Sequence, residues 1–86
     1  MMSGRRAARL YTTVGCHLCE QAAALLHRAR SEGFAFEVCE VEISDSESLM
    51  EAYGVRIPVV RFDGDERELG WPFEYQDLID LIESLE

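Results

Sequence analysis

The amino-acid sequence predicts a small α/β domain in which helices pack on a mixed four-stranded sheet, a three-layer sandwich with the element order β-α-β-α-β-β-α. Three observations support this fold class. Short segments rich in aromatic and β-branched residues alternate with segments in which apolar residues recur every three or four positions. Glycine-containing turn signals separate these segments. A chain of 86 residues, 48% of them apolar, is long enough for one hydrophobic core and too short for two.

The first half of the chain begins with a strand and a helix. We expect residues 1–7 to be a mobile N-terminal tail and residues 8–86 to form a single domain, with its first strand at residues 8–12. The helix that follows has an apolar side and should stop at Gly33, since glycine is common just after a helix end. The residues of the expected apolar side are Leu18, Ala22, Leu25 and Ala29.

The next two elements are a strand and a short helix. Residues 34–43 mix aromatic and β-branched side chains with alternating acids, which indicates a strand. Ser44 and Glu47 have the spacing of a helix capping box, so a short helix should begin there. Gly54 should end it.

The last third of the sequence predicts a hairpin and a final helix. Residues 57–62 and 66–70 should be strands joined at the Asp-Gly turn of residues 63–64. We expect the first three strands to be parallel, or partly so, with the hairpin adding an antiparallel edge and helices covering both faces. The apolar stripe of the final helix consists of Tyr75, Leu78, Leu81, Ile82 and Leu85.

The charge balance excludes some classes of partner. The chain has 17 acidic residues against eight basic ones, and its formal net charge is −9. Binding to nucleic-acid backbones relies on clustered positive charge, so we expect no nucleic-acid partner. No apolar segment approaches the roughly 18 residues of a membrane span, and the opening residues do not resemble a secretory signal. We therefore expect a cytoplasmic monomer without a membrane partner.

Two cysteines carry the strongest chemical signal. Cys16 and Cys19 form a Cys-x-x-Cys pair where the first strand should become a helix. The positive end of the helix dipole favours a thiolate there, and Cys-x-x-Cys sites lower a thiol pKa from about 8.5 to about 7. We expect Cys16 to attack a disulfide and Cys19, one turn further along, to resolve the mixed disulfide. His17, between them, is a candidate for tuning the pKa of Cys16.

Other roles for the cysteines are weaker. A structural zinc site needs four ligands, and the sequence offers no second Cys/His pair at ligand spacing, so we expect no metal site. Cys39, on the second strand, should be a single thiol packed against a neighbour, with a regulatory disulfide as a minor alternative. We assign no function to His27.

Three segments resemble the glutaredoxin-like branch of the thioredoxin superfamily. They are YTTVGCHLC at residues 11–19, GVRIPVV at 54–60 and RELGW at 67–71. The resemblance extends from about Leu10 to Leu85 and implies a thioredoxin-like fold. It also implies that Pro58 follows a cis peptide bond beside the cysteine pair, which would leave the backbone N–H and C=O of Ile57 open to a substrate.

Several positions depart from the family pattern. Glutaredoxins often have proline and tyrosine between the two cysteines, where this chain has His17 and Leu18. A lysine that lies near a glutathione carboxylate is replaced by Thr13, and the Gly-Gly-acid pattern before the last helix is reduced to residues 69–71. Arg56 is a candidate to replace one of these contacts by pairing with a carboxylate. Trp71 is a candidate wall of the site, although packing is the favoured role.

The resemblance predicts a dithiol–disulfide oxidoreductase that acts in cell redox homeostasis. Its substrates would be disulfide-bearing proteins or glutathionylated thiols, with glutathione or another thiol as reductant and no bound cofactor. The alternative is a thioredoxin-fold binding module, an adaptor or a carrier of a metal or iron–sulfur cluster, with little turnover. The expected substrate-binding residues are Arg56, Ile57, Pro58, Gly70 and Trp71.

Overall fold

The computed structural model describes residues 6–85 and has the predicted order of elements. Most of the tail expected at residues 1–7 lies outside the described residues, whereas Arg6 and Ala7 belong to the first strand. The elements are β1 (Arg6–Thr12), α1 (His17–Ser31), β2 (Phe36–Glu42), the 3₁₀ turn η1 (Ile43–Asp45), α2 (Glu47–Tyr53), β3 (Val59–Phe62), β4 (Leu69–Gly70) and α3 (Tyr75–Ser84).

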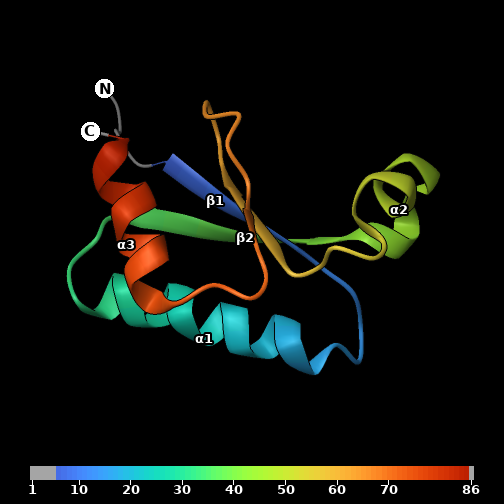
Figure 1. The fold of residues 1–86 in the computed structure, drawn as a ribbon, viewed down its shortest axis with the longest axis horizontal. Coiled ribbons are helices and arrows are strands. Elements are labelled where there is room, and N and C mark those ends of the chain that lie inside the picture. Colours follow the sequence, from blue (N-terminus) through green and yellow to red (C-terminus); the bar gives the residue numbers. More distant parts are fainter. Residues whose placement is uncertain (1–5, 86) are drawn as a thin grey trace.

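The described strands form one mixed sheet in the order β2-β1-β3-β4. β1 and β2 are parallel, and β3 is antiparallel to both β1 and β4. Of the two expected arrangements, the partly parallel one is therefore confirmed by β1 and β2, and a third strand parallel to the first is not found. The reason lies in α2, which stands beyond the end of the sheet at which β2 leaves (Figure 1). The chain consequently re-enters the sheet from that same end, and β3 runs back.

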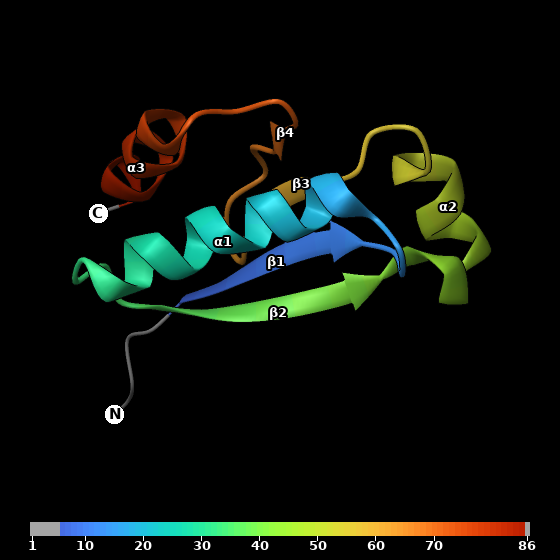
Figure 2. The same ribbon diagram turned by 90° about the horizontal axis from the view of Figure 1, so that it is seen from below.

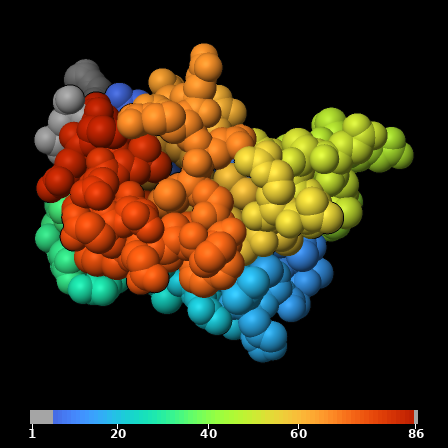
Figure 3. Space-filling view, in the orientation of Figure 1, coloured from blue at the N-terminus to red at the C-terminus, as the bar shows by residue number. Residues whose placement is uncertain are grey.

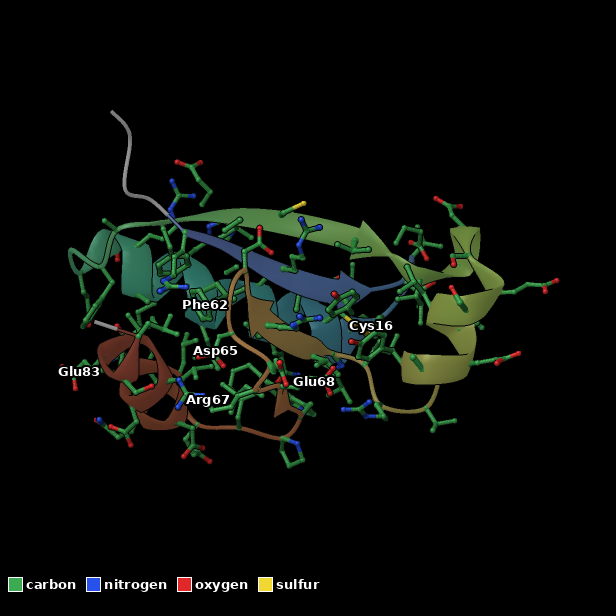
Figure 4. All side chains as sticks on the ribbon, turned by 90° about the horizontal axis from the view of Figure 1, so that it is seen from above. Cys16, Phe62, Asp65, Arg67, Glu68 and Glu83 are labelled. Atoms are coloured by element: carbon green, nitrogen blue, oxygen red, sulfur yellow. A yellow bond between two sulfur atoms is a disulfide. The ribbon has the colours of Figure 1, made fainter. Side chains whose placement is uncertain are left out.

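The two faces of the sheet are covered unequally. The main core packs one face against α1 and α3, and it includes Leu10, Phe62 and Leu78. Figure 2 shows α1 in front of the sheet, and Figure 4 shows it behind the sheet from the opposite side. A second cluster on the other face covers one end only; it consists of Tyr11, Ile43, Tyr53 and Val59.

The uncovered part of that second face contains Cys39. Its Cα pairs with that of Arg9 in the sheet, and side chains alternate along a strand, so both residues face away from α1. Cys39 is exposed. The expectation of a thiol packed against a neighbour is therefore wrong, because α2 is too short to cover the middle of this face.

The buried side of α1 differs from the predicted one. The structure buries Cys19, Ala22, Leu26 and Ala29. Leu18 is 44% exposed, and Leu25 is only partly buried against the core. The observed and predicted sets both fit a period of 3.6 residues, so periodicity alone could not choose between them. The packing of α1 on the sheet fixes its rotation.

The predicted end of α1 is confirmed, and the predicted start of α2 is not. Gly33 follows the end of α1 with φ at +107°, a left-handed conformation suited to glycine, which confirms the predicted stop. The cap of α2 is Ser46, whose Oγ accepts the Leu49 N–H at 3.3 Å, rather than Ser44. Ser44 lies inside the 3₁₀ turn that precedes α2, so the helix begins later than predicted.

Candidate redox-active site

Cys16 and Cys19 form a disulfide at the N-terminal end of α1, with their Cα atoms 5.2 Å apart. Cys16 is the residue that caps the helix, and its backbone is extended. Its Sγ accepts the Cys19 N–H at 3.1 Å. The unpaired N–H groups and positive dipole of a helix start favour negative charge at this position. The arrangement therefore suits a thiolate at Cys16 once the disulfide is reduced.

The two cysteines differ in accessibility. Cys16 is partly exposed, whereas Cys19 is 4% exposed. The prediction that Cys19 is the more buried of the two is confirmed, whereas the roles of attacker and resolver stay a prediction. His17 is exposed in the first turn of the helix, beside Cys16 in sequence.

A hollow of about 220 Å³ lies beside the disulfide, between the start of α1 and the strands β1 and β2. Its lining includes Thr13, Gly15, Cys16, Cys19, Glu20 and Glu40. Thr13 donates its hydroxyl hydrogen to the Glu42 carboxylate at 2.7 Å. This hydrogen bond is the main cause that lowers the pKa of Glu42, so Glu42 is ionised at neutral pH. The side of the site next to β2 is therefore acidic.

Pro58 lies at the same end of the sheet as the disulfide. The Ile57–Pro58 peptide bond is cis, as predicted, and Pro58 is fully buried. Val59 pairs with Tyr11, so continuing the antiparallel register places Pro58 opposite Thr12, four residues before Cys16. The backbone N–H of Ile57 donates to the Tyr53 carbonyl at 3.1 Å. The expectation that this N–H is open to a substrate is wrong, because the chain makes a further turn after α2.

Arg56 is exposed, but its guanidinium is held by contacts within the protein. Its guanidinium pairs with Glu68 and donates to the Ala52 carbonyl at 3.2 Å. It also lies 5.2 Å from the centre of the Tyr53 ring. The predicted pairing with a substrate carboxylate would have to displace Glu68. Sequence reasoning missed Glu68 because it is 12 residues away on a different segment.

Tyr53 and Glu68 form the second half of this network. The Tyr53 hydroxyl donates to Glu68 Oε2 at 2.6 Å. That hydrogen bond, with burial as a second cause, raises the pKa of Tyr53 to about 12 from an ordinary value of 10.0. The same bond and the Arg56 guanidinium lower the pKa of Glu68. The network ties the segment before β4 to the end of α2.

Replacing Tyr53 with phenylalanine should remove one cause by which the free energy of unfolding falls at alkaline pH. The raised pKa means that the folded chain keeps the phenol proton while the unfolded chain loses it, so this stabilisation is full below pH 10 and is lost as pH rises towards 12. We expect Tyr53→Phe to cost about 1–2 kcal/mol at neutral pH, since it removes a hydrogen bond to a charged acceptor. Urea unfolding at about pH 8 and about pH 11 measures both effects. If the unchanged protein and Tyr53→Phe lose the same free energy of unfolding between these two pH values, the raised pKa of Tyr53 would be contradicted.

Gly70 and Trp71 join β4 to the core. Gly70 pairs with Val59 in the sheet. Trp71 donates its backbone N–H to the Pro58 carbonyl at 3.1 Å, and its half-buried ring meets Phe73 edge to face at 5.2 Å. It packs against the main core, which confirms the favoured packing role. The Trp71–Pro72 peptide bond is also cis, which the sequence analysis did not predict.

Other chemical groups in residues 6–85 lie apart from this site. Cys39 faces away from α1, so the structure does not bring it to the cysteine pair. His27 is exposed in the second half of α1. No three His, Cys, Asp or Glu side chains within the described part of the chain are grouped as metal ligands would be. None of the helices there has the length and apolarity that a membrane crossing requires.

Comparison with protein families and solved structures gives consistent matches. The family named "Glutaredoxin-like domain (DUF836)" matches residues 8–83. A structural-genomics target protein from X. campestris, solved by X-ray crystallography, is 40% identical with a TM-score of 0.77, over 90% of this chain and 96% of that one. A protein from Nitrosomonas europaea, solved by NMR, is 28% identical with a TM-score of 0.76, over 94% of each chain.

A more distant structure shows a similar fold. A variant of thioredoxin from Halobacterium salinarum is 24% identical with a TM-score of 0.69, over 92% of this chain and 73% of that one. Comparison with curated proteins gives no match.

Proposed function

The chain belongs to the glutaredoxin-like domain family and has a thioredoxin-like fold, and on that premise we propose that it is a thiol–disulfide oxidoreductase. One observation carries the proposal. A disulfide caps the first turn of α1, with one sulfur accessible and the other buried. This asymmetry is what a two-step exchange reaction needs, because substrate enters at one sulfur and leaves through attack by the other.

The reaction begins with both cysteines reduced. The Cys16 thiolate attacks one sulfur of a substrate disulfide, forms a mixed disulfide and expels the other substrate sulfur as a thiolate, which takes a proton from solvent. The Cys19 thiol loses its proton to solvent and attacks the Cys16 sulfur, and the second substrate thiolate leaves. The substrate gains two electrons, and the protein holds the Cys16–Cys19 disulfide. Two external thiols, from glutathione or another thiol donor, then reduce this disulfide and become a disulfide themselves.

The contacts around the site favour a disulfide-bearing protein over glutathione as substrate. Thr13 is bonded to Glu42, Arg56 is paired with Glu68, and Trp71 packs in the core. Thr13 and Trp71 are uncharged, and Arg56 is already paired, so none of the three offers a free positive charge to the carboxylates of glutathione. Exposed apolar side chains lie next to Cys16 instead, namely Val14 at 87% and Leu18 at 44% exposure. Such side chains suit contact with another polypeptide.

Steady-state assays with two substrates test this proposal. The reduced protein should speed the reduction of a protein disulfide well above the rate of an equal concentration of a small dithiol. Reduction of a mixed disulfide between glutathione and a small thiol, coupled to glutathione and its reductase, should be slower. The Cys39→Ser variant is the matched control and should retain full activity, since Cys39 is on the other face. Exchange no faster than that of the small dithiol with either substrate would refute the proposal.

A further inference from the structure

The hollow beside the disulfide carries carboxylates from two elements. Glu20 lies in the first turn of α1, and Glu40 reaches the hollow from β2. Neither carboxylate has an ionic or hydrogen-bonding partner within residues 6–85. Negative charge at a helix start stabilises the helix, which gives Glu20 a structural role as well. Glu40 is exposed on β2, an edge strand of the sheet, so its charge costs the fold little and remains available at the rim of the hollow.

The cations of the described residues do not offset this charge. Arg9 pairs with Asp63, and Arg67 pairs with Asp65, near the β3–β4 turn. That turn is at the opposite end of the sheet from Val59 and the disulfide, as Figure 4 shows for Cys16 and Arg67. Arg28 and Arg30 are in the last turn of α1, and Arg56 is bound to Glu68. The hollow is therefore negative, and its ionised neighbour Glu42 adds to this charge.

Exposed apolar side chains surround the same end of the molecule. β1 and β2 are parallel, so the loops that follow them both lie at this end. Figure 3 shows the blue start of α1 and the yellow segment before β3 together there. The large hydrophobic side chains that residues 6–85 expose belong to the loop before α1, the first turn of α1, the middle of α2 and the segment after α2. They are Val14, Leu18, Met50 and Val55.

We infer that this site takes a polypeptide disulfide whose flanking residues are basic and apolar, with the basic side chain entering the hollow between Glu20 and Glu40. The inference rests on the proposed function and names its substrate class. Opposite charges at the rim of a binding site raise the association rate and exclude wrong partners. Glutathione carries two carboxylates, so the same charges oppose its approach.

Matched peptide substrates test the inference. Two peptides of equal length carry one central cysteine as a mixed disulfide with 2-mercaptoethanol, flanked by lysine and leucine in one and by glutamate and leucine in the other. We expect kcat/KM for reduction of the lysine peptide to be roughly tenfold higher at low salt, and the ratio to fall at high salt, because salt screens exposed charges.

Two double variants distinguish the effect of the charges in the hollow from the effect of the net charge of the protein. Glu20→Gln with Glu40→Gln should reduce the preference to roughly twofold to threefold. Glu66→Gln with Glu83→Gln changes the net charge equally and should leave the preference unchanged. Glu66 follows the β3–β4 turn, and Figure 4 shows Glu83 far from Cys16.

A binding measurement separates this inference from the proposed function. Cysteine-free versions of both peptides are titrated against the disulfide form of the protein, with chemical shifts of the α1 start as the readout. Weaker binding of the glutamate peptide and shifts near Glu20 and Glu40 support the inference, even in a protein that reduces neither substrate. Equal binding and equal reduction of both peptides would overturn it and leave the oxidoreductase function standing.

Discussion

Replacing Cys16 with serine is expected to abolish disulfide reduction, with a loss on the order of a thousandfold or more, because a serine hydroxyl is not ionised at neutral pH and forms no disulfide. Cys19→Ser should behave differently. Cys16 remains accessible and can still attack, but the buried resolving thiol is gone. The mixed disulfide should therefore accumulate as a covalent adduct between the protein and half of the substrate.

Mass spectrometry of each variant after a single exposure to substrate distinguishes these outcomes. Cys19→Ser should carry one substrate half at Cys16, and Cys16→Ser should carry none. The Cys39→Ser control should carry none either, since its resolving cysteine is present and its missing thiol lies on the other face. An adduct that forms on Cys19 when Cys16 is absent would show that the assignment of attacker and resolver is reversed.

The sequence predicted the cysteine pair well because the pair is local. A Cys-x-x-Cys motif at the end of a strand places both residues in one helix turn, whatever the rest of the chain does. The greater burial of Cys19 was also predicted, but it depends on the rotation of α1 on the sheet, which spacing alone does not determine. The position of Pro58 came from the resemblance, and the register of β3 against β1 explains why it returns to this end.

Features that depend on contacts between distant segments were not predicted. The pairing of Arg56 with Glu68 joins the loop after α2 to the segment before β4, and no sequence pattern links them. The direction of β3 depends on where α2 rests, which propensity does not encode. Ser46 caps α2 in place of Ser44 because residues 43–45 form a 3₁₀ turn, capped by the Glu42 carboxylate, before the helix begins. In each case a tertiary or competing contact decided between locally acceptable alternatives.

The rotation of α1 gives the second prediction with a large effect. Leu25 belongs to the buried side that the sequence predicts, and Leu26, the same residue type one position later, belongs to the buried side that the structure shows. Leu26 is fully buried, and Leu25 is only partly buried. We expect Leu26→Ala to lower the free energy of unfolding by about 2–5 kcal/mol, since it removes buried methyl groups and leaves a cavity. A domain of this length has a total of roughly 4–13 kcal/mol, so the loss is a large part of it. Leu25→Ala should cost only about 1 kcal/mol.

Urea unfolding of the disulfide form, with unchanged m-values as the test of two-state behaviour, measures both costs. Equal costs, or a larger cost at Leu25, would mean that α1 is rotated towards the side that includes Leu18. That rotation would also turn Cys19 out of the core, because Cys19 and Leu26 share one buried stripe. A stability difference measured two turns along the helix thus bears on which sulfur a substrate can reach.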